Sequence, residues 1–366
     1  MRASRLLSAL AILSICLLEV SCSHFQSSGG PNRLAMLRLV REYGQNHQVA
    51  QPAPAAQSPL QTEDDYMRPV TASLNASDFA QLEKDAQEAR TTKGRLLGGG
   101  WKVYMFYAAV TYPPAGDQST DADWANHIQT LIQWKTAQPD SATARIALAQ
   151  AYVNYGWKAR GTGFSNSVTQ DGWSKLNERI GLAASALSDA ATKKDRCPYW
   201  YEVMQQIALA QGWSKSQTKQ LFDQATAFEP GYYHYYREYA KYLFPKWYGD
   251  KGEVQTFATA SADHLGGQQG NFVYFEITSM LLCPCYPKTA SLDGISWPRV
   301  KQGYAALGQL YGVSDLKLNR FAFMAHAAND KPQEQELLAQ IHNNWVESAW
   351  LNKDNFDQAK TWAATP

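Results

Sequence analysis

From Ser77 onward, the spacing of apolar residues follows the period of an α-helix. Ser77 and Asp78 provide an N-cap for a segment that ends at Arg90 and carries Phe79 and Leu82 on one face. No stretch alternates β-branched and polar residues as a half-buried strand does. The chain is therefore predicted to be all-α. Further helices are expected around the stripe at 101–108 and over residues 122–137, 141–157, 172–192, 198–212, 215–228, 232–244, 252–264, 270–282, 296–311, 315–328 and 332–343.

Two stretches match the tetratricopeptide repeat, a helix pair of about 34 residues whose second helix ends at a Pro. Pro139 and Pro230 fit that closing Pro, but they lie 91 residues apart, because extra residues within 161–171 interrupt the period. We predict an α-solenoid of helix pairs, and a generic α-helical bundle is the alternative. Other residues at repeat packing positions are Leu148, Ala149, Tyr152, Phe222, Ala225, Tyr236, Tyr239, Ala240 and Leu243.

Tryptophan and tyrosine are abundant, with 12 Trp and 20 Tyr, whereas charged residues make up 18%. This composition is compatible with a sugar-binding surface or with large core side chains. Because Tyr152, Tyr236 and Tyr239 fall on packing positions, we expect most of these rings to fill grooves between helices. The formal net charge of +1 argues against a broad basic field for nucleic acid or anionic lipid.

The first 21 residues are typical of an export signal. Arg2 and Arg5 precede an apolar run, Leu6 to Leu18, that is too short for a comfortable membrane span and ends at Glu19. We therefore predict a signal peptide over residues 1–21 and a location in the bacterial cell envelope.

Cys22 is the predicted lipidation site, which would tether the protein to a membrane facing the periplasm. Ser21 suits the position before a lipidated Cys, whereas Glu19 stands where the lipoprotein signal prefers Leu. The alternative is cleavage near Ser23 and a soluble periplasmic protein. Acyl chains would supply membrane affinity of about 0.8 kcal/mol for each buried methylene group.

Residues 22–75 are predicted to be a flexible linker, because residues 51–59 are rich in Pro and Ala. Within it, Pro31 to Tyr43 has the pattern of a short basic amphipathic helix, which we interpret as a transient helix in the linker. The helical-repeat domain is expected over residues 76–350, followed by a C-terminal tail over 351–366.

Three cysteines remain after the signal and the anchor: Cys197, Cys283 and Cys285. In an oxidising compartment Cys197 could pair with one of the other two, or all three could be plain buried thiols. Cys283 and Cys285 are too close in sequence to bridge each other without strain. A Cys-x-Cys pair without a second Cys pair or a nearby His is a weak metal signal, so no metal site is expected.

Several strings in the helical region are distinctive when taken together and in order. They are residues 157–161, 172–173, 211–213, 229–233, 245–250, 252–253 and 296–299. As a set they resemble the bacterial family called domain of unknown function 4034. The resemblance covers roughly residues 76–350 and implies a helical-repeat-like fold. It implies no activity and no catalytic residue, and the segment around Cys283 departs from it.

The insertion after Ala159 is the first candidate surface. Residues 160–167 are small, polar and Gly-rich, and their backbone could form an anion-binding nest with Arg160. The segment lacks the Lys-Ser/Thr ending of a P-loop, so nucleotide binding is not expected. The alternative is an internal clamp in which Arg160 folds back onto helix-terminal carbonyls.

The second candidate surface is residues 245–253. Trp247 beside Lys246 could bind a peptide or a glycan, and Asp250 with Glu253 could form an acid–base pair. The alternative is a Pro-stopped helix followed by a turn, in which one of the two carboxylates caps the next helix.

The tyrosine-rich segment 232–242 is the third candidate surface. Most of its tyrosines are expected in the core, while Tyr233 and His234 could form a binding face.

Motifs for catalysis are missing from the sequence. The seven His show no zinc spacing, and there is no Gly-x-Ser-x-Gly elbow. We therefore expect no enzyme and no cofactor, but a helical-repeat protein that binds a protein or peptide partner along its stacked helices. Its partner contacts are predicted at Trp157, Arg160, Lys246 and Trp247. The alternative is a carbohydrate-binding or carbohydrate-active envelope protein.

Overall fold

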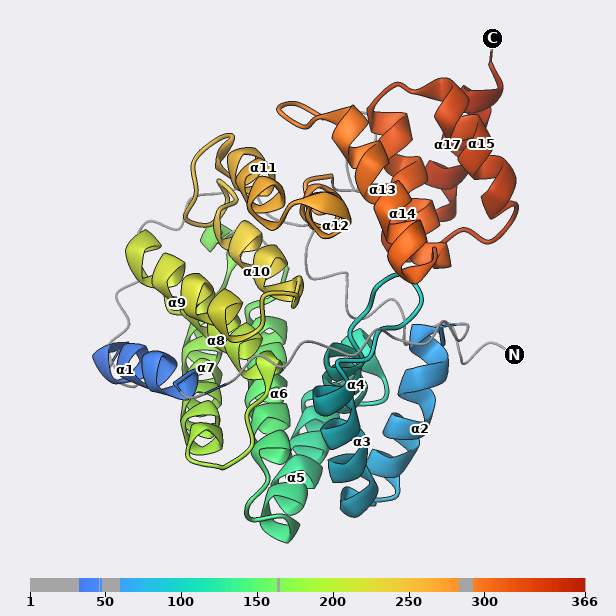
Figure 1. Ribbon diagram of the computed structural model, residues 1–366. Coiled ribbons are helices and arrows are strands. Elements are labelled where there is room, and N and C mark those ends of the chain that lie inside the picture. The colour runs from blue at the N-terminus through green and yellow to red at the C-terminus, as the bar shows by residue number, and fades with distance from the viewer. Residues whose placement is uncertain (1–32, 46, 48–59, 163–164, 283–291, 366) are drawn as a thin grey trace. The chain divides into compact units, whose positions relative to one another are not determined.

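The structure is a computed structural model that describes residues 33–45, 47, 60–162, 165–282 and 292–365 (Figure 1). Over these ranges it is all-α, as predicted, with seventeen α-helices, two short 3-10 turns and one isolated β-bridge between Arg95 and Trp101. The chain divides into two compact units, which we call the N-terminal unit (described residues 33–95 and 100–250) and the C-terminal unit (96–99 and 251–365).

Ten helices form the N-terminal unit: α1 (Arg33–Tyr43), α2 (Glu63–Asn75), α3 (Phe79–Thr92), α4 (Lys102–Val110), α5 (Asp121–Ala137), α6 (Ala142–Arg160), α7 (Gln170–Ala191), α8 (Pro198–Ala210), α9 (Lys215–Phe228) and α10 (His234–Tyr242). Helices α4, α6, α8 and α10 follow one another in one layer, and α5, α7 and α9 pack against them in a second layer (Figure 1). This alternation is the stacking of helix pairs that the sequence predicts. Side chains such as Ser214 and Thr120 cap the helices through reciprocal capping boxes.

The repeat positions pack largely as predicted. Phe222 of α9 stacks on Tyr239 of α10 with ring centroids 4.7 Å apart, and Ala225 and Ala240 are fully buried between the same helices. Tyr152 is the exception, since it is half-exposed on α6.

Large aromatic side chains fill the core of the N-terminal unit, and several of their polar tips donate to backbone carbonyls. Trp200 Nε1 donates to Leu187 O at 2.9 Å, and Tyr242 Oη donates to Trp213 O at 2.7 Å. Such bonds offset the cost of burying a hydroxyl or an indole N–H, whereas the indole N–H groups of Trp101 and Trp124 are buried without an acceptor among the described residues. The tryptophan and tyrosine content therefore serves mainly to build the core.

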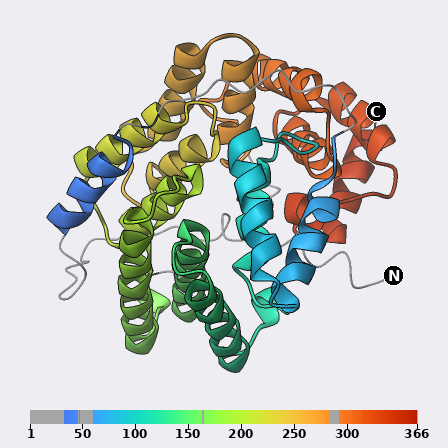
Figure 2. The same ribbon diagram turned by 60° about the horizontal axis from the view of Figure 1, so that its bottom comes forward.

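Helix α1 corrects the interpretation of its segment as a transient helix in a linker. It packs against α7 and α9 (Figure 2), and Met36, Val40 and Tyr43 are buried. Tyr43 stacks on Trp200 with centroids 4.1 Å apart, and its hydroxyl accepts a 2.8 Å hydrogen bond from the Cys197 backbone N–H. The apolar face of α1 is thus part of the core.

Two further expected boundaries also differ from the structure. Helix α2 lies in the predicted linker, yet it buries Met67, Val70 and Leu74 and accommodates Pro69 in its interior. The predicted tail forms α17 (Lys353–Ala364), whose apolar face is buried. Both segments are short, so their stability comes from tertiary packing that the local pattern does not reveal.

Seven helices form the C-terminal unit: α11 (Glu253–Leu265), α12 (Gly267–Thr278), α13 (Trp297–Tyr311), α14 (Asp315–Ala327), α15 (Lys331–Ile341), α16 (Glu347–Trp350) and α17. A short strap from far upstream, Leu96–Gly99, belongs to this unit. Its Leu96 is fully buried, and the Gly98 N–H donates to Tyr311 O at 3.3 Å.

Candidate functional site

Two of the four predicted contact residues meet in the structure. Trp157, near the end of α6, and Trp247, in the turn after α10, form an edge-to-face pair with ring centroids 5.5 Å apart and planes inclined by 76°. Both side chains are half-exposed. The pair therefore presents aromatic surface from two segments 90 residues apart in sequence.

A tight turn after α10 positions Trp247. The Trp247 N–H donates to Phe244 O at 2.8 Å, and Tyr248 stacks on Tyr242 with centroids 4.9 Å apart. Gly249 passes so close to Leu243 that a Cβ at this position would overlap the Leu243 carbonyl oxygen. The turn thus requires glycine, and it holds the Trp247 backbone in one place.

Arg160 lies close to Trp157 and to a third tryptophan, Trp173. It is 6% exposed, and its guanidinium carbon lies 5.7 Å from the ring centroid of Trp157 and 5.1 Å from that of Trp173 in the first turn of α7. Such distances allow cation–π attraction. We call Trp157, Trp173, Trp247 and Arg160 the tryptophan cluster.

The guanidinium of Arg160 also donates to the Gly161 carbonyl at 3.2 Å, which is the internal clamp considered above. Residues 163 and 164 of the predicted anion nest lie outside the described residues. Trp173 was not predicted as a contact, although Gly172-Trp173 is one of the strings shared with the resembling family. Trp173 meets Arg160 across the loop that separates α6 from α7, and local sequence patterns do not reveal such a contact.

Lys246, the fourth predicted contact, is half-exposed beside Trp247, with its ammonium 5.2 Å from the ring centroid of Phe244. Asp250 forms a 2.7 Å ion pair with Lys215 and is highly exposed. Glu253 is the first residue of α11, where the helix dipole favours a carboxylate. These contacts give Asp250 and Glu253 structural roles in different units.

The predicted binding face at Tyr233 and His234 is wrong. Tyr233 is 4% exposed and His234 6% exposed, and the imidazole stacks on Tyr104 with centroids 3.8 Å apart. Helix α10 packs on both α8 and α9, so nearly all of its faces are buried.

Helix α8, which packs against α10, carries a buried carboxyl group, Glu202, that the sequence did not reveal. Glu202 of α8 is 2% exposed, and the hydroxyl of Tyr232 donates to its Oε2 at 2.6 Å. Burial raises the pKa of Glu202 well above its usual range. A carboxyl group in such surroundings favours the neutral form.

Cys197 is a fully buried free thiol. The Tyr107 hydroxyl lies 3.7 Å from its Sγ, and burial raises the pKa of the thiol. A buried neutral thiol is a poor nucleophile. Cys22, Cys283 and Cys285 lie outside the described residues.

Among the residues that the structure describes, no group of three or more His, Cys, Asp and Glu side chains is arranged to hold a metal ion. Likewise, none of the described helices is both long and apolar enough to cross a bilayer.

Comparison with known proteins identifies no relative: no family model, no curated protein and no solved structure matches this chain.

Proposed function

We propose that this chain is a non-catalytic helical-repeat protein of the bacterial envelope that binds a protein or peptide partner through the tryptophan cluster. The observation that carries the proposal is the half-exposed Trp157–Trp247 pair beside Arg160. Trp and Arg are the residues most enriched among binding hot spots. An indole has only two side-chain torsions, so ordering it on binding costs little entropy.

The cluster is organised before any partner arrives. Trp247 is held by a turn that requires Gly249, and Arg160 is fixed by its own helix terminus. Preorganised contacts avoid part of the entropic cost of association. Truncating either exposed indole to Ala is therefore expected to weaken binding by about 2 kcal/mol, roughly thirtyfold.

Photo-crosslinking in the native envelope tests this proposal. A photoreactive amino acid is placed at position 157 or 247 in separate variants, with Leu182, exposed on α7, as the matched control position. We expect the same protein to be captured from both cluster positions and not from position 182. Identical capture patterns at all three positions would refute the assignment.

Membrane tethering through Cys22, after removal of residues 1–21, is part of the same proposal. The Arg-flanked apolar run and the Ser21-Cys22 junction support it. Metabolic labelling with a radioactive fatty acid should mark the natural protein and not a Cys22→Ala variant. A Cys22→Ala variant that still fractionates with membranes would contradict it. Membership of domain of unknown function 4034 likewise stays a prediction.

A carbohydrate partner is the second candidate, because half-exposed indole faces are also surfaces on which sugar rings stack. The ion pair of Asp250 with Lys215 favours binding over acid–base catalysis in that case. A panel of cell-wall glycans, tested for binding and for cleavage, separates this candidate from a protein partner.

A further inference from the structure

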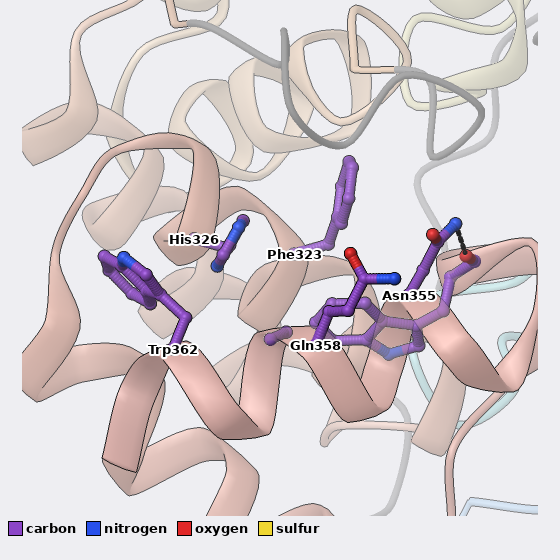
Figure 3. Close-up of a pocket in the computed structure, with 7 residues that line it drawn as sticks. Phe323, His326, Asn355, Gln358 and Trp362 are labelled. Carbon is purple, nitrogen blue, oxygen red and sulfur yellow. Dashed lines mark hydrogen bonds between the residues drawn. The ribbon is translucent and has the colours of Figure 1, made fainter. Parts of the chain in front are cut away.

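The C-terminal unit contains a pocket of about 190 Å³ between α14 and α17 (Figure 3). Phe323, Trp350 and Trp362 supply its aromatic lining, and Ala359 completes the apolar surface. A closed apolar cavity of about 150 Å³ is enough to hold benzene. The pocket here is partly open to solvent, and its volume is enough for one six-membered aromatic ring with a small substituent.

Three polar side chains also belong to this lining, His326, Asn355 and Gln358, and His326 lies among the aromatic rings. Figure 3 shows His326 between Phe323 and Trp362, and the His326 and Trp362 rings meet edge to face with centroids 4.7 Å apart. Nδ1 of His326 lies 3.1 Å and 3.2 Å from the two carboxyl oxygens of Glu334, whose side chain is fully buried. A carboxylate accepts hydrogen bonds, so we assign Nδ1 as the donor in this pair.

The other ring nitrogen of His326 is available to a ligand. Within the described part of the chain, Nε2 makes no hydrogen bond, and the His326 side chain is 23% exposed. Glu334 thus fixes the imidazole ring in the pocket lining and leaves Nε2 for a ligand. Pockets of this kind use their few polar groups to orient a ligand.

The remaining polar lining argues against a ligand with many hydroxyl groups. Asn355 already donates to Trp350 O at 2.8 Å, and Trp350 Nε1 donates to Asn319 Oδ1 at the same distance. Gln358 also lines the pocket, and it is exposed to solvent. A sugar ring would leave most of its hydroxyl groups against Phe323 and Trp362 without partners, which is unfavourable.

We propose that this pocket is a binding site for a phenol ring, whose hydroxyl group hydrogen-bonds to Nε2 of His326. A phenol hydroxyl both donates and accepts, so it suits either protonation state of the imidazole. The ring comes either from a small phenolic molecule or from a tyrosine side chain of another chain. The site lies within the C-terminal unit, so it is independent of the tryptophan cluster.

Ligand-observed saturation-transfer NMR with the full chain tests the proposal. The probes are phenol, toluene, which lacks the hydroxyl group, cyclohexanol, which lacks the aromatic ring, and N-acetyltyrosinamide. We expect phenol to bind saturably with a Kd of about a millimolar, the range open to so small a ligand. Toluene and cyclohexanol should bind several-fold more weakly. Absence of saturable phenol binding, or equal binding of cyclohexanol, would overturn the proposal.

Three variants locate the site. His326→Phe should weaken phenol binding about tenfold and leave toluene binding unchanged. Trp362→Leu, at a half-exposed indole, should weaken both ligands. Lys360→Gln, exposed on α17 and outside the lining, is the matched control.

Removing His326 also takes away the hydrogen-bond partner of buried Glu334, so circular dichroism is used to check that the His326→Phe variant folds. If it does not fold, the Trp362→Leu variant alone tests the location of the site. Phenol binding unaffected by Trp362→Leu would refute the location. Binding of N-acetyltyrosinamide as well as phenol supports a tyrosine side chain as the source of the ring, and binding of phenol alone supports a small molecule.

Discussion

Replacing Tyr43 by Phe tests whether α1 belongs to the folded core. The substitution keeps the ring on Trp200 but removes the oxygen that accepts the Cys197 backbone N–H at 2.8 Å. Both groups are buried, so the N–H is left without an acceptor. That loss costs about 1–3 kcal/mol, and the Phe ring recovers part of it because no hydroxyl has to be desolvated. We expect a net destabilisation of about 1–2 kcal/mol.

Hydrogen exchange measures this effect locally. If α1 opens as a unit, a loss of about 1–2 kcal/mol accelerates exchange of its amides roughly five- to thirtyfold. Tyr242→Phe is the matched control, because it removes an equally buried hydroxyl, bonded to Trp213 O, from α10. It should leave exchange in α1 unchanged.

If Tyr43→Phe leaves α1 exchange as it is in the natural protein, and that exchange is already fast, then α1 is part of the linker. The contacts of Tyr43 would then add nothing to stability in solution.

Three further predictions follow from buried or crowded positions. Gly249→Ala should lower stability by at least about 2 kcal/mol, because its Cβ overlaps Leu243 O, and should displace Trp247; an unchanged melting temperature would contradict the turn geometry. The raised pKa of Glu202 means that the folded state keeps a proton that the unfolded chain releases near pH 4.3, so its contribution to stability falls as pH rises above that value. Glu202→Gln should flatten this fall in thermal melts recorded between about pH 5 and 8. A pH profile that the substitution leaves unaltered would count against the buried, protonated Glu202. Cys197 should resist alkylation in the native protein and react on unfolding, as mass spectrometry of the labelled peptide would show; fast native labelling would mean that α1 does not cover it.

The fold was predictable because helices leave a local record in the spacing of apolar residues. Helix α9 has the predicted bounds, and α14 differs by one residue at its end. Helices α1 and α17 were assigned to a linker and a tail, because their stability depends on partners far along the chain. Helix α2 was also hard to predict, because a proline inside a helix, here Pro69, removes a backbone hydrogen bond.

The candidate site was only partly predictable. Trp157 and Trp247 could each be singled out as aromatics beside loops, but their contact depends on the stacking of α6 with α8 and of α8 with α10. Tyr233 and His234 were misjudged because α10 packs on two neighbours rather than one. Glu202 looked like any surface carboxylate in the sequence, and only burial distinguishes it.

The strap Leu96–Gly99 means that the C-terminal unit is not one continuous stretch of the gene. Four of its residues are synthesised about 150 positions before the rest, and they include the buried Leu96 and the donor to Tyr311 O. During synthesis this unit can be completed only after residues 251 onward emerge and gather around a segment made much earlier. A fragment that starts at residue 251 would lack an internal part of its own core. Transfer of this unit to another gene would therefore require two separate insertions, one for residues 96–99 and one for residues 251 onward. The unit is thus expected to be inherited together with the helical repeats that separate its two parts.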